Sequence, residues 1–281
     1  MTTTPASRKR TLTSSAMNLS SLSNPPLHQV PDDAPPNDAN DLSLKSGKSS
    51  TSQSGKSLSS RSGRSIPNNL STKEYHDRCR KVAEARVEDM VHRHHKFRTE
   101  ESNRIDQSRW KLIKDKSHMA CYRKIGKSGL GQVPDVLATG VVPGTLEDVL
   151  HGVVNLSTEA MQIENAYAGG DMVDNRILVT LLAPTISDPF RTMTIKWVLR
   201  NHEELSRHRD YVYLESTGIT TAPDGERVGY HLVHSISLPS APEFTKDTNI
   251  IRGQISSCYV YRQHRQNGVE VFYIGNMNPQ G

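Results

Sequence analysis

The chain has 281 residues, with 35 Lys or Arg against 30 Asp or Glu and a formal net charge of +5. Eight basic and four acidic residues fall in the first 70 positions, so the remaining 211 hold 27 basic and 26 acidic residues and are nearly neutral. A folded nucleic-acid-binding domain usually carries its own basic excess, so this balance argues against nucleic acid as a partner. The three cysteines, Cys79, Cys121 and Cys258, are too scattered for a disulfide framework or a zinc finger.

Residues 1–70 form a leader rich in Ser and Pro that contains no Phe, Tyr or Trp. Without large apolar side chains, this segment cannot bury enough surface to offset the entropy of ordering, so we expect it to be disordered. Its part 43–65 has five basic residues among many serines and no acid. Serines close to basic residues are typical substrates of kinases that prefer basic sequences, and phosphorylation of these serines would reverse the local charge. With no secretory signal and no long apolar run, we expect a cytoplasmic protein whose contact with membranes is at most peripheral.

A long helix is expected from residue 71 to about residue 104. Ser71 and Glu74 are spaced as a capping box, and apolar residues follow mostly three or four positions apart. A cluster of histidines at 92–95 lacks an acid or Cys at metal-ligand spacing, so it is interpreted as a solvated helix face. No metal site and no cofactor are therefore predicted.

Beyond this helix, the pattern predicts a few short elements and then a long antiparallel meander. Two strands flank a turn within 109–126, another strand lies near 136–142, and a short helix spans 143–155. Six strands follow, separated by turn residues, at 177–183, 191–200, 210–217, 228–238, 250–262 and 268–275. A helix followed by an antiparallel sheet indicates the α+β class.

Catalytic signatures fail on inspection, so we do not expect an enzyme. The tripeptide GKS occurs three times, but the Gly that a phosphate loop requires five residues before its Gly-Lys pair is replaced by Leu42, Ser50 and Cys121. No G-x-S-x-G nucleophile elbow is present. A hydrolase or cyclase would need an acid–base pair, for which His234 with Glu215 is the one candidate.

The strands offer one-sided apolar faces in place of reactive groups. Period-two alternation puts Met193, Ile195 and Trp197 on one face of their strand, and it puts Tyr213 with Glu215 on one face of the next. A curved sheet with such a face must cover it with a helix, a ligand or both. For any single residue of these faces, the alternative to contact with a ligand is burial in an ordinary packed core.

The element order and five stretches of sequence resemble a START (StAR-related lipid-transfer) domain, most like the START-like proteins of oomycetes. The stretches are RWKLIKDKSHMACYRK, GVVPGTLEDVLHGVVN, DPFRTMTIKWVLR, RDYVYLESTG with GYHLVHSISLP, and TNIIRGQISSCYVYRQ with VEVFYIGNMNPQG. The resemblance implies a helix-grip fold, in which a curved antiparallel sheet packs on a long N-terminal helix. Together with the composition of the leader and the helical spacing that follows it, the resemblance divides the chain into a disordered tail at 1–70, an N-terminal helix at 71–105 and a START-like lipid-binding domain at 106–281.

The family's function would be to hold one sterol or phospholipid in an apolar cavity, for intracellular lipid transfer or sensing. The residues expected to line that cavity are Met193, Ile195, Trp197, Arg200, Tyr213, Glu215, Leu232, His234, Val260 and Phe272. The expected partners are a lipid, the surface of a membrane and a kinase that acts on the tail.

Two departures from the family pattern stand out. The sequence stops at Gly281, where the lid helix of the family would begin, so that helix is expected to be missing. Many members place an Arg and an acid inside the cavity, but alignment on Arg191 puts Trp197 at the Arg position, leaving Arg200 and Glu215 as substitutes. Relatives in oomycetes often carry a FYVE-type zinc finger after this domain, but the three scattered cysteines exclude such a finger within these residues.

The alternative function is a non-catalytic interaction or regulatory module that docks on membranes through its phosphorylatable basic tail.

Overall fold

The computed structural model describes residues 73–279, except 117, 127–132, 169, 202–205, 239, 246 and 266. The leader at 1–70 and the expected cap residue Ser71 lie outside the described residues. The described part contains three helices and ten strands. In chain order these are α1 (Lys73–Thr99), β1 (Trp110–Lys116), β2 (Met119–Lys124), β3 (Val136–Pro143), α2 (Leu146–Val153), α3 (Thr158–Tyr167), β4 (Met172–Leu182), β5 (Thr192–Arg200), β6 (His208–Thr221), β7 (Arg227–Ser235), β8 (Ile250–Arg252), β9 (Gln254–Arg265) and β10 (Gly268–Asn278).

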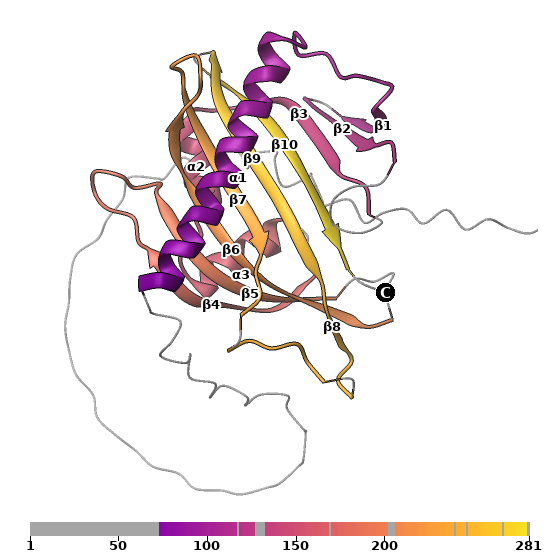
Figure 1. The fold of residues 1–281 in the computed structure, drawn as a ribbon, viewed down its shortest axis with the longest axis vertical. Coiled ribbons are helices and arrows are strands. Elements are labelled where there is room, and N and C mark those ends of the chain that lie inside the picture. The colour runs from indigo at the N-terminus through magenta and orange to yellow at the C-terminus, as the bar shows by residue number, and fades with distance from the viewer. Residues whose placement is uncertain are drawn as a thin grey trace, which may run out of the picture.

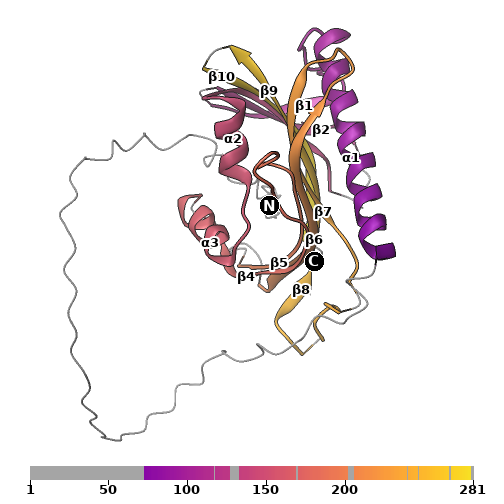
Figure 2. The same cartoon turned by 90° about the vertical axis from the view of Figure 1, so that its left-hand side faces the viewer.

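The strands form a single sheet in the order β1-β2-β3-β10-β9-β7-β6-β5-β4, with antiparallel neighbours throughout. The short β8 lies off this path and pairs in parallel with the start of β6. The helix α1 runs across one side of the sheet, whereas α2 and α3 lie on the other side (Figures 1 and 2). We call the side that packs on α1 the helix face, and the side towards α2 and α3 the inner face.

The largest hydrophobic core lies between α1 and the helix face. Apolar residues of α1 recur at helical spacing and are buried there, namely Cys79, Ala83, Val87, Met90, Val91 and Phe97. They pack with alternate residues of the strands, including Ile195, Leu214, Leu232, Val260 and Phe272. Burying one such large side chain stabilises the fold by about 1.5–3 kcal/mol, so this layer holds α1 in place.

The helix α2 is specified by its cap and by two leucines. The Thr145 hydroxyl accepts a hydrogen bond from the amide of Asp148 at 3.1 Å, and the Asp148 carboxylate accepts from the Thr145 amide at 2.8 Å. Leu146 and Leu150 are then buried against the inner face. A Cβ at Gly229 of β7 would lie 3.0–3.1 Å from their methyl groups, so the glycine lets α2 approach the sheet closely.

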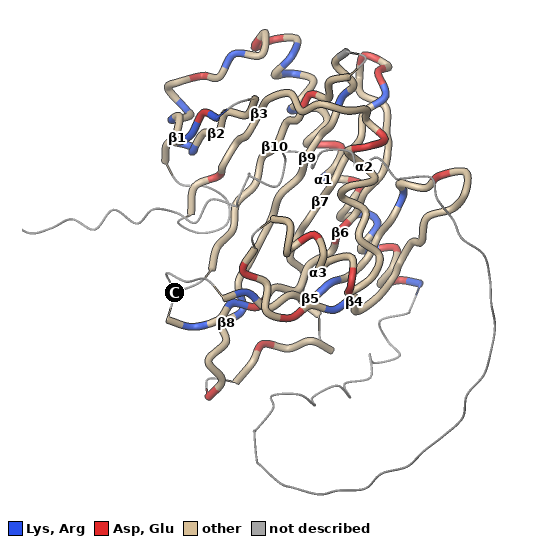
Figure 3. Tube along the Cα trace, turned by 180° about the vertical axis from the view of Figure 1, so that it is seen from behind, with Lys and Arg blue, Asp and Glu red and all other residues tan. Residues whose placement is uncertain are grey.

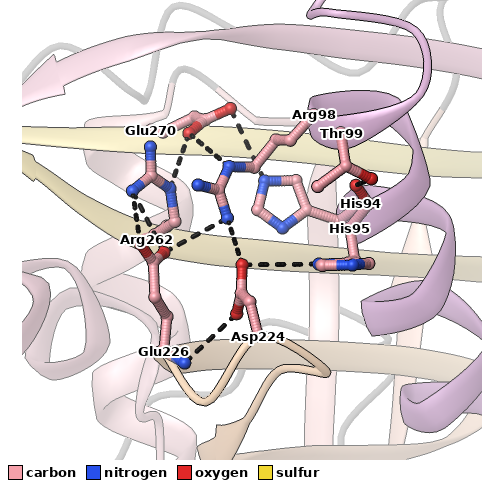
Figure 4. A network of polar contacts seen from close by, with 8 residues as sticks. All are labelled: His94, His95, Arg98, Thr99, Asp224, Glu226, Arg262 and Glu270. Carbon is pink, nitrogen blue, oxygen red and sulfur yellow. Dashed lines mark hydrogen bonds and ion pairs between the residues drawn. The ribbon is translucent and has the colours of Figure 1, made fainter.

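A polar network ties the end of α1 to three other segments (Figure 4). Arg98 pairs with Asp224 and Glu226 of the β6–β7 turn, at 3.1 Å each. The fully buried His94 lies 3.5 Å from Glu270 of β10, which also pairs with Arg262 of β9 at 3.0 Å. The C-terminal turns of α1 are therefore fixed by charge as well as by apolar packing.

The expected α+β class, the helix-grip arrangement and the antiparallel meander are confirmed, with shifted boundaries. The helix α1 stops at Thr99 because the chain turns sharply there, with φ of 50° at Ser102 and 59° at Asn103. The expected strand at 250–262 is divided at Gly253 into β8 and β9. The sequence prediction missed α3 altogether. No helix in the described part is both long and apolar enough to span a bilayer.

Candidate functional site

Three charged or titratable side chains from adjacent strands meet on the inner face. Lys196 of β5 donates a hydrogen bond to the Glu215 carboxylate of β6. His231 of β7 lies beside the other oxygen of the same carboxylate, with Nε2 and Oε1 3.1 Å apart. Lys196 is 1% exposed and Glu215 is 8% exposed. We call these residues the charged trio.

Strand register explains why the trio meets. Thr194 pairs with Glu215 across β5 and β6, and Thr217 pairs with His231 across β6 and β7. Residues two apart on a strand share a face, so Lys196, Glu215 and His231 all project to the inner side. Burial by itself would raise the pKa of Glu215, but the Lys196 charge and the His231 hydrogen bond outweigh it and lower the pKa. Glu215 is therefore a carboxylate near neutral pH.

An aromatic row continues from the trio along the inner face. The His231 ring stacks on Tyr259 of β9, with centroids 5.7 Å apart and planes 14° apart. Tyr259 in turn contacts Tyr261, at 5.8 Å, and Tyr273 of β10, at 4.5 Å. Burial raises the pKa of all three tyrosines, so their hydroxyls stay neutral. The row presents ring faces beside a small set of polar groups.

A fourth ionisable group approaches the trio from α3. Glu164 accepts a hydrogen bond from the Asn155 amide at 2.6 Å. Desolvation is the main influence on its carboxyl and raises its pKa, and the charges of His231, Glu215 and Lys196 act on it as well. Glu164 nevertheless keeps an exposed surface. Its carboxyl therefore borders solvent while it lies within electrostatic reach of the trio.

Some hydrogen-bonding groups at the charged trio have no protein partner among the described residues. Thr194 is 1% exposed, and its buried hydroxyl has no hydrogen-bond partner among the described residues. Lys196 carries three N–H donors, of which one goes to Glu215. Buried polar groups are nearly always hydrogen-bonded, so a bound water or ligand oxygen is expected at this point.

The ten residues expected to line a cavity are divided between the two faces. Arg200, Tyr213 and Glu215 lie on the inner face, where Arg200 pairs with Asp171 at 2.7 Å. The other seven lie on the helix face, within or beside the core that α1 covers, namely Met193, Ile195, Trp197, Leu232, His234, Val260 and Phe272. Those seven cannot contact a ligand bound on the inner face, because the sheet itself lies between.

Two specific pairings expected from sequence are wrong. Trp197 and Tyr213 were expected to face one space, but Trp197 pairs with Val212 across the strands and so lies on the face opposite Tyr213. Likewise His234 pairs across from Leu214, not Glu215, and it bonds to Ser256 at 3.0 Å. The imidazole beside Glu215 is that of His231.

Lys196 and the tyrosines of β9 and β10 were missed by the sequence prediction. Lys196 lies between the apolar residues Ile195 and Trp197, where a lysine is usually solvent-facing, and its partner Glu215 is 19 positions away in the chain. The only usable signal was the alternation of tyrosines at 259, 261 and 273. Among the described residues, no cluster of three or more His, Cys, Asp or Glu is suited to a metal ion.

Two cavities of the structure lie away from the inner face. One of about 590 Å³ runs along the first turns of α1 and is bordered by charged side chains such as Lys73, Asp77 and Arg78. The other, of about 210 Å³, lies at the far end of α1 beside Phe97 and Glu270. Neither includes a member of the charged trio.

No family model and no curated protein sequence matches the chain. Solved structures with a similar fold include human StAR-related lipid transfer protein 5, at 14% identity and a TM-score of 0.49, covering 73% of this chain and 84% of that one. Human STARD10 is similar at 15% identity and a TM-score of 0.42, covering 66% and 67%. A fragment of a STAR-related lipid transfer protein from Xanthomonas axonopodis is similar at 18% identity and a TM-score of 0.41, covering 61% and 83%. At these levels of similarity, the function of the chain has to be inferred from its own residues.

Proposed function

We propose that the chain is a lipid-binding module that holds one sterol or phospholipid against the inner face of its sheet. The observation that carries the proposal is the charged trio, which is buried beside an aromatic row rather than on the surface. Such a combination, with a few convergent polar groups in mostly apolar surroundings, is typical of a site for a largely apolar ligand.

The chemistry of the site divides naturally between two parts of a lipid. A hydroxyl or phosphate oxygen of the lipid would accept a hydrogen bond from the Lys196 ammonium. The same polar group would form a hydrogen bond with the Thr194 hydroxyl. The apolar part would lie along the tyrosine rings, where burial contributes about 25 cal/mol for each Å² removed from water. Neither part needs a nucleophile, which agrees with the absence of a catalytic signature in the sequence.

Native mass spectrometry of the purified full chain, combined with organic extraction, tests the proposal. We expect one lipid per chain, and uptake of a fluorescent sterol or phospholipid by chain stripped of its lipid. A chain that yields no lipid and takes up neither probe would refute the proposal.

A bulky substitution on the inner face provides the matched control. Val233 of β7 is partly buried next to Glu215 and pairs with it across the strands. Val233→Trp should reduce probe uptake by at least about tenfold, because the indole would occupy the ligand's place. Val173→Trp makes the same change at a position of β4 that is 57% exposed, and uptake should be unchanged.

The wider role follows from the cargo. A carrier or sensor of membrane lipids has to touch a bilayer peripherally, and the proposed setting is the cytoplasm. Kinase action on the basic tail would regulate that contact. If the domain proves empty and the tail alone binds membranes, the regulatory-module alternative takes precedence.

A further inference from the structure

The β1–β2 hairpin, taken as residues 109–125, concentrates positive charge in an otherwise acidic domain. It holds six basic residues and one acid, which gives a net charge of +5. The rest of residues 71–281 has 21 basic and 25 acidic residues, a net charge of −4. Figure 3 shows the basic positions gathered along β1 and β2.

This charge is exposed and little of it is neutralised. The side chains of Arg109, Lys111, Lys114, Lys116 and Arg123 are all exposed. Of the hairpin's basic residues, Lys124 alone forms an ion pair among the described residues. Its Nζ lies 3.4 Å from a carboxylate oxygen of Asp135. The hairpin therefore projects a positive field into solvent.

Aliphatic side chains are exposed among these cations. Leu112 is 50% exposed, Ile113 is 42% exposed and Ile125 is 54% exposed. The strand β1 ends the sheet, with β2 as its neighbour and no described strand beyond it. A bulge between Leu112 and Lys114 displaces Ile113 from regular pairing. Basic groups and aliphatic groups thus share one outer edge of the molecule.

We propose that this hairpin is a docking surface for an anionic lipid bilayer. Its lysines and arginines would bind acidic headgroups, while Leu112, Ile113 and Ile125 enter the boundary between headgroups and acyl chains. The proposal deepens the proposed function and rests on it, since it names the surface through which a lipid-binding module would reach its membrane.

Other partners fit the hairpin less well. Single-stranded nucleic acid is bound through exposed aromatic rings, but Trp110 and Tyr122 are only partly exposed and pack on the main core. Pairing with a second copy along β1 would bring two sets of lysines together, which is a common way of preventing such association. An anionic bilayer accommodates both the cations and the aliphatic groups.

Vesicle flotation of the full chain tests the proposal. Vesicles with about 30 mol% phosphatidylserine in phosphatidylcholine should bind the chain at 0.15 M salt, and pure phosphatidylcholine should not. The variant Lys111→Gln/Lys114→Gln/Lys116→Gln should lose roughly fivefold in affinity per lysine, on the order of 100-fold in total. Its matched control, Lys73→Gln/Lys81→Gln/Lys96→Gln, removes three exposed charges from α1 and leaves the basic leader intact, so binding should change far less.

A second pair of variants tests the aliphatic contribution. Leu112→Ser/Ile113→Ser/Ile125→Ser should weaken binding about tenfold and raise its sensitivity to salt. The control Ile163→Ser/Val173→Ser/Ile186→Ser changes three exposed apolar residues elsewhere and should bind as wild type does. All these positions are exposed, and circular dichroism with thermal melting verifies that each variant is folded.

Each other outcome overturns the proposal. Failure of the wild type to bind anionic vesicles would do so. Undiminished binding by the hairpin variant would assign binding to the leader, and equal losses in the hairpin and α1 variants would assign it to overall charge. RNA would be the partner if the chain bound it equally tightly and the aliphatic substitutions had no effect on that binding. A second copy would be the partner if the chain formed a dimer that the hairpin substitutions dissociated. Lipid recovered by mass spectrometry from a chain that binds no vesicles would refute the docking surface and leave the proposed function standing.

Discussion

Lys196 and Glu215 form an ion pair on adjacent strands, and the structure buries both side chains on the inner face of the sheet. An ion pair in such a place is weak support for stability as a whole, because desolvation offsets much of its attraction. Loss of one partner is different, since it leaves a single charge in surroundings that cannot hydrate it.

The first prediction concerns this pair. Lys196→Met should lower the free energy of unfolding by about 3–5 kcal/mol, because the Glu215 carboxylate would lose its main counter-charge. The double variant Lys196→Met/Glu215→Gln should recover most of that loss. Urea denaturation of the wild type, both single variants and the double variant gives the coupling energy, and additive effects would contradict the ion pair.

The second prediction concerns Glu270 on the helix face (Figure 4). Desolvation would raise its pKa, but the His94 imidazole, 3.5 Å away, together with the Arg262 guanidinium, lowers the pKa to about 2 from the ordinary 4.5. A folded-state pKa below the unfolded value stabilises the protein above pH 4.5, and this stabilisation is lost as the pH falls towards 2. The full contribution is about 3 kcal/mol.

Thermal melting between pH 6 and pH 2 measures this effect. The melting temperature of wild type should fall steeply below pH 4.5, whereas Glu270→Gln should start lower and show a flatter dependence. Glu100→Gln alters an exposed glutamate just beyond the end of α1 and should keep the wild-type slope. Parallel curves for wild type and Glu270→Gln would be evidence against the lowered pKa of Glu270.

The third prediction concerns His234, whose pKa is lowered to about 4 by burial and by the nearby charge of Arg86. The unfolded chain would bind a proton near pH 6.5, so the histidine makes stability fall as the pH drops from 6.5 towards 4. His234→Gln should remove this dependence, and the amide can still bond to Ser256. Denaturation midpoints at pH 7 and pH 5 give the comparison, and an unchanged difference between them would count against the assignment.

The fourth prediction separates the two faces of the sheet. Ile195 is completely buried in the core under α1, so Ile195→Ala should cost about 2–5 kcal/mol of stability. The folded fraction of this variant should still carry as much lipid per chain as the wild type. Denaturation with native mass spectrometry measures both quantities, and a variant of normal stability that loses lipid would show that Ile195 faces the ligand.

Sequence periodicity was sufficient for most of the strands but not for the orientation of the sheet. Alternation correctly grouped Met193, Ile195 and Trp197 on one face, since side chains along a strand alternate by geometry alone. It could not say which face packs on α1, because both faces of the central strands are largely buried. The long run from Arg209 to Gly218 is buried at every position.

The missed elements share a physical cause. In α3 the single buried apolar residue is Met161, whereas Ile163 and Tyr167 are exposed, so the segment lacks the stripe by which an amphipathic helix is recognised. The charged trio depends on register between strands that are distant in sequence. Neither propensity nor local pattern encodes that register, which is set when β5, β6 and β7 pair.

Because each central strand gives alternate residues to the α1 core and to the inner face, mutational tolerance along it should itself have a period of two. At odd positions of β5 such as 193 and 195, substitutions would be selected for fold integrity. At even positions such as 194 and 196, substitutions would change which lipid is preferred, provided that the buried charge of Glu215 keeps a partner. The two properties could then diverge independently within a single nine-residue strand.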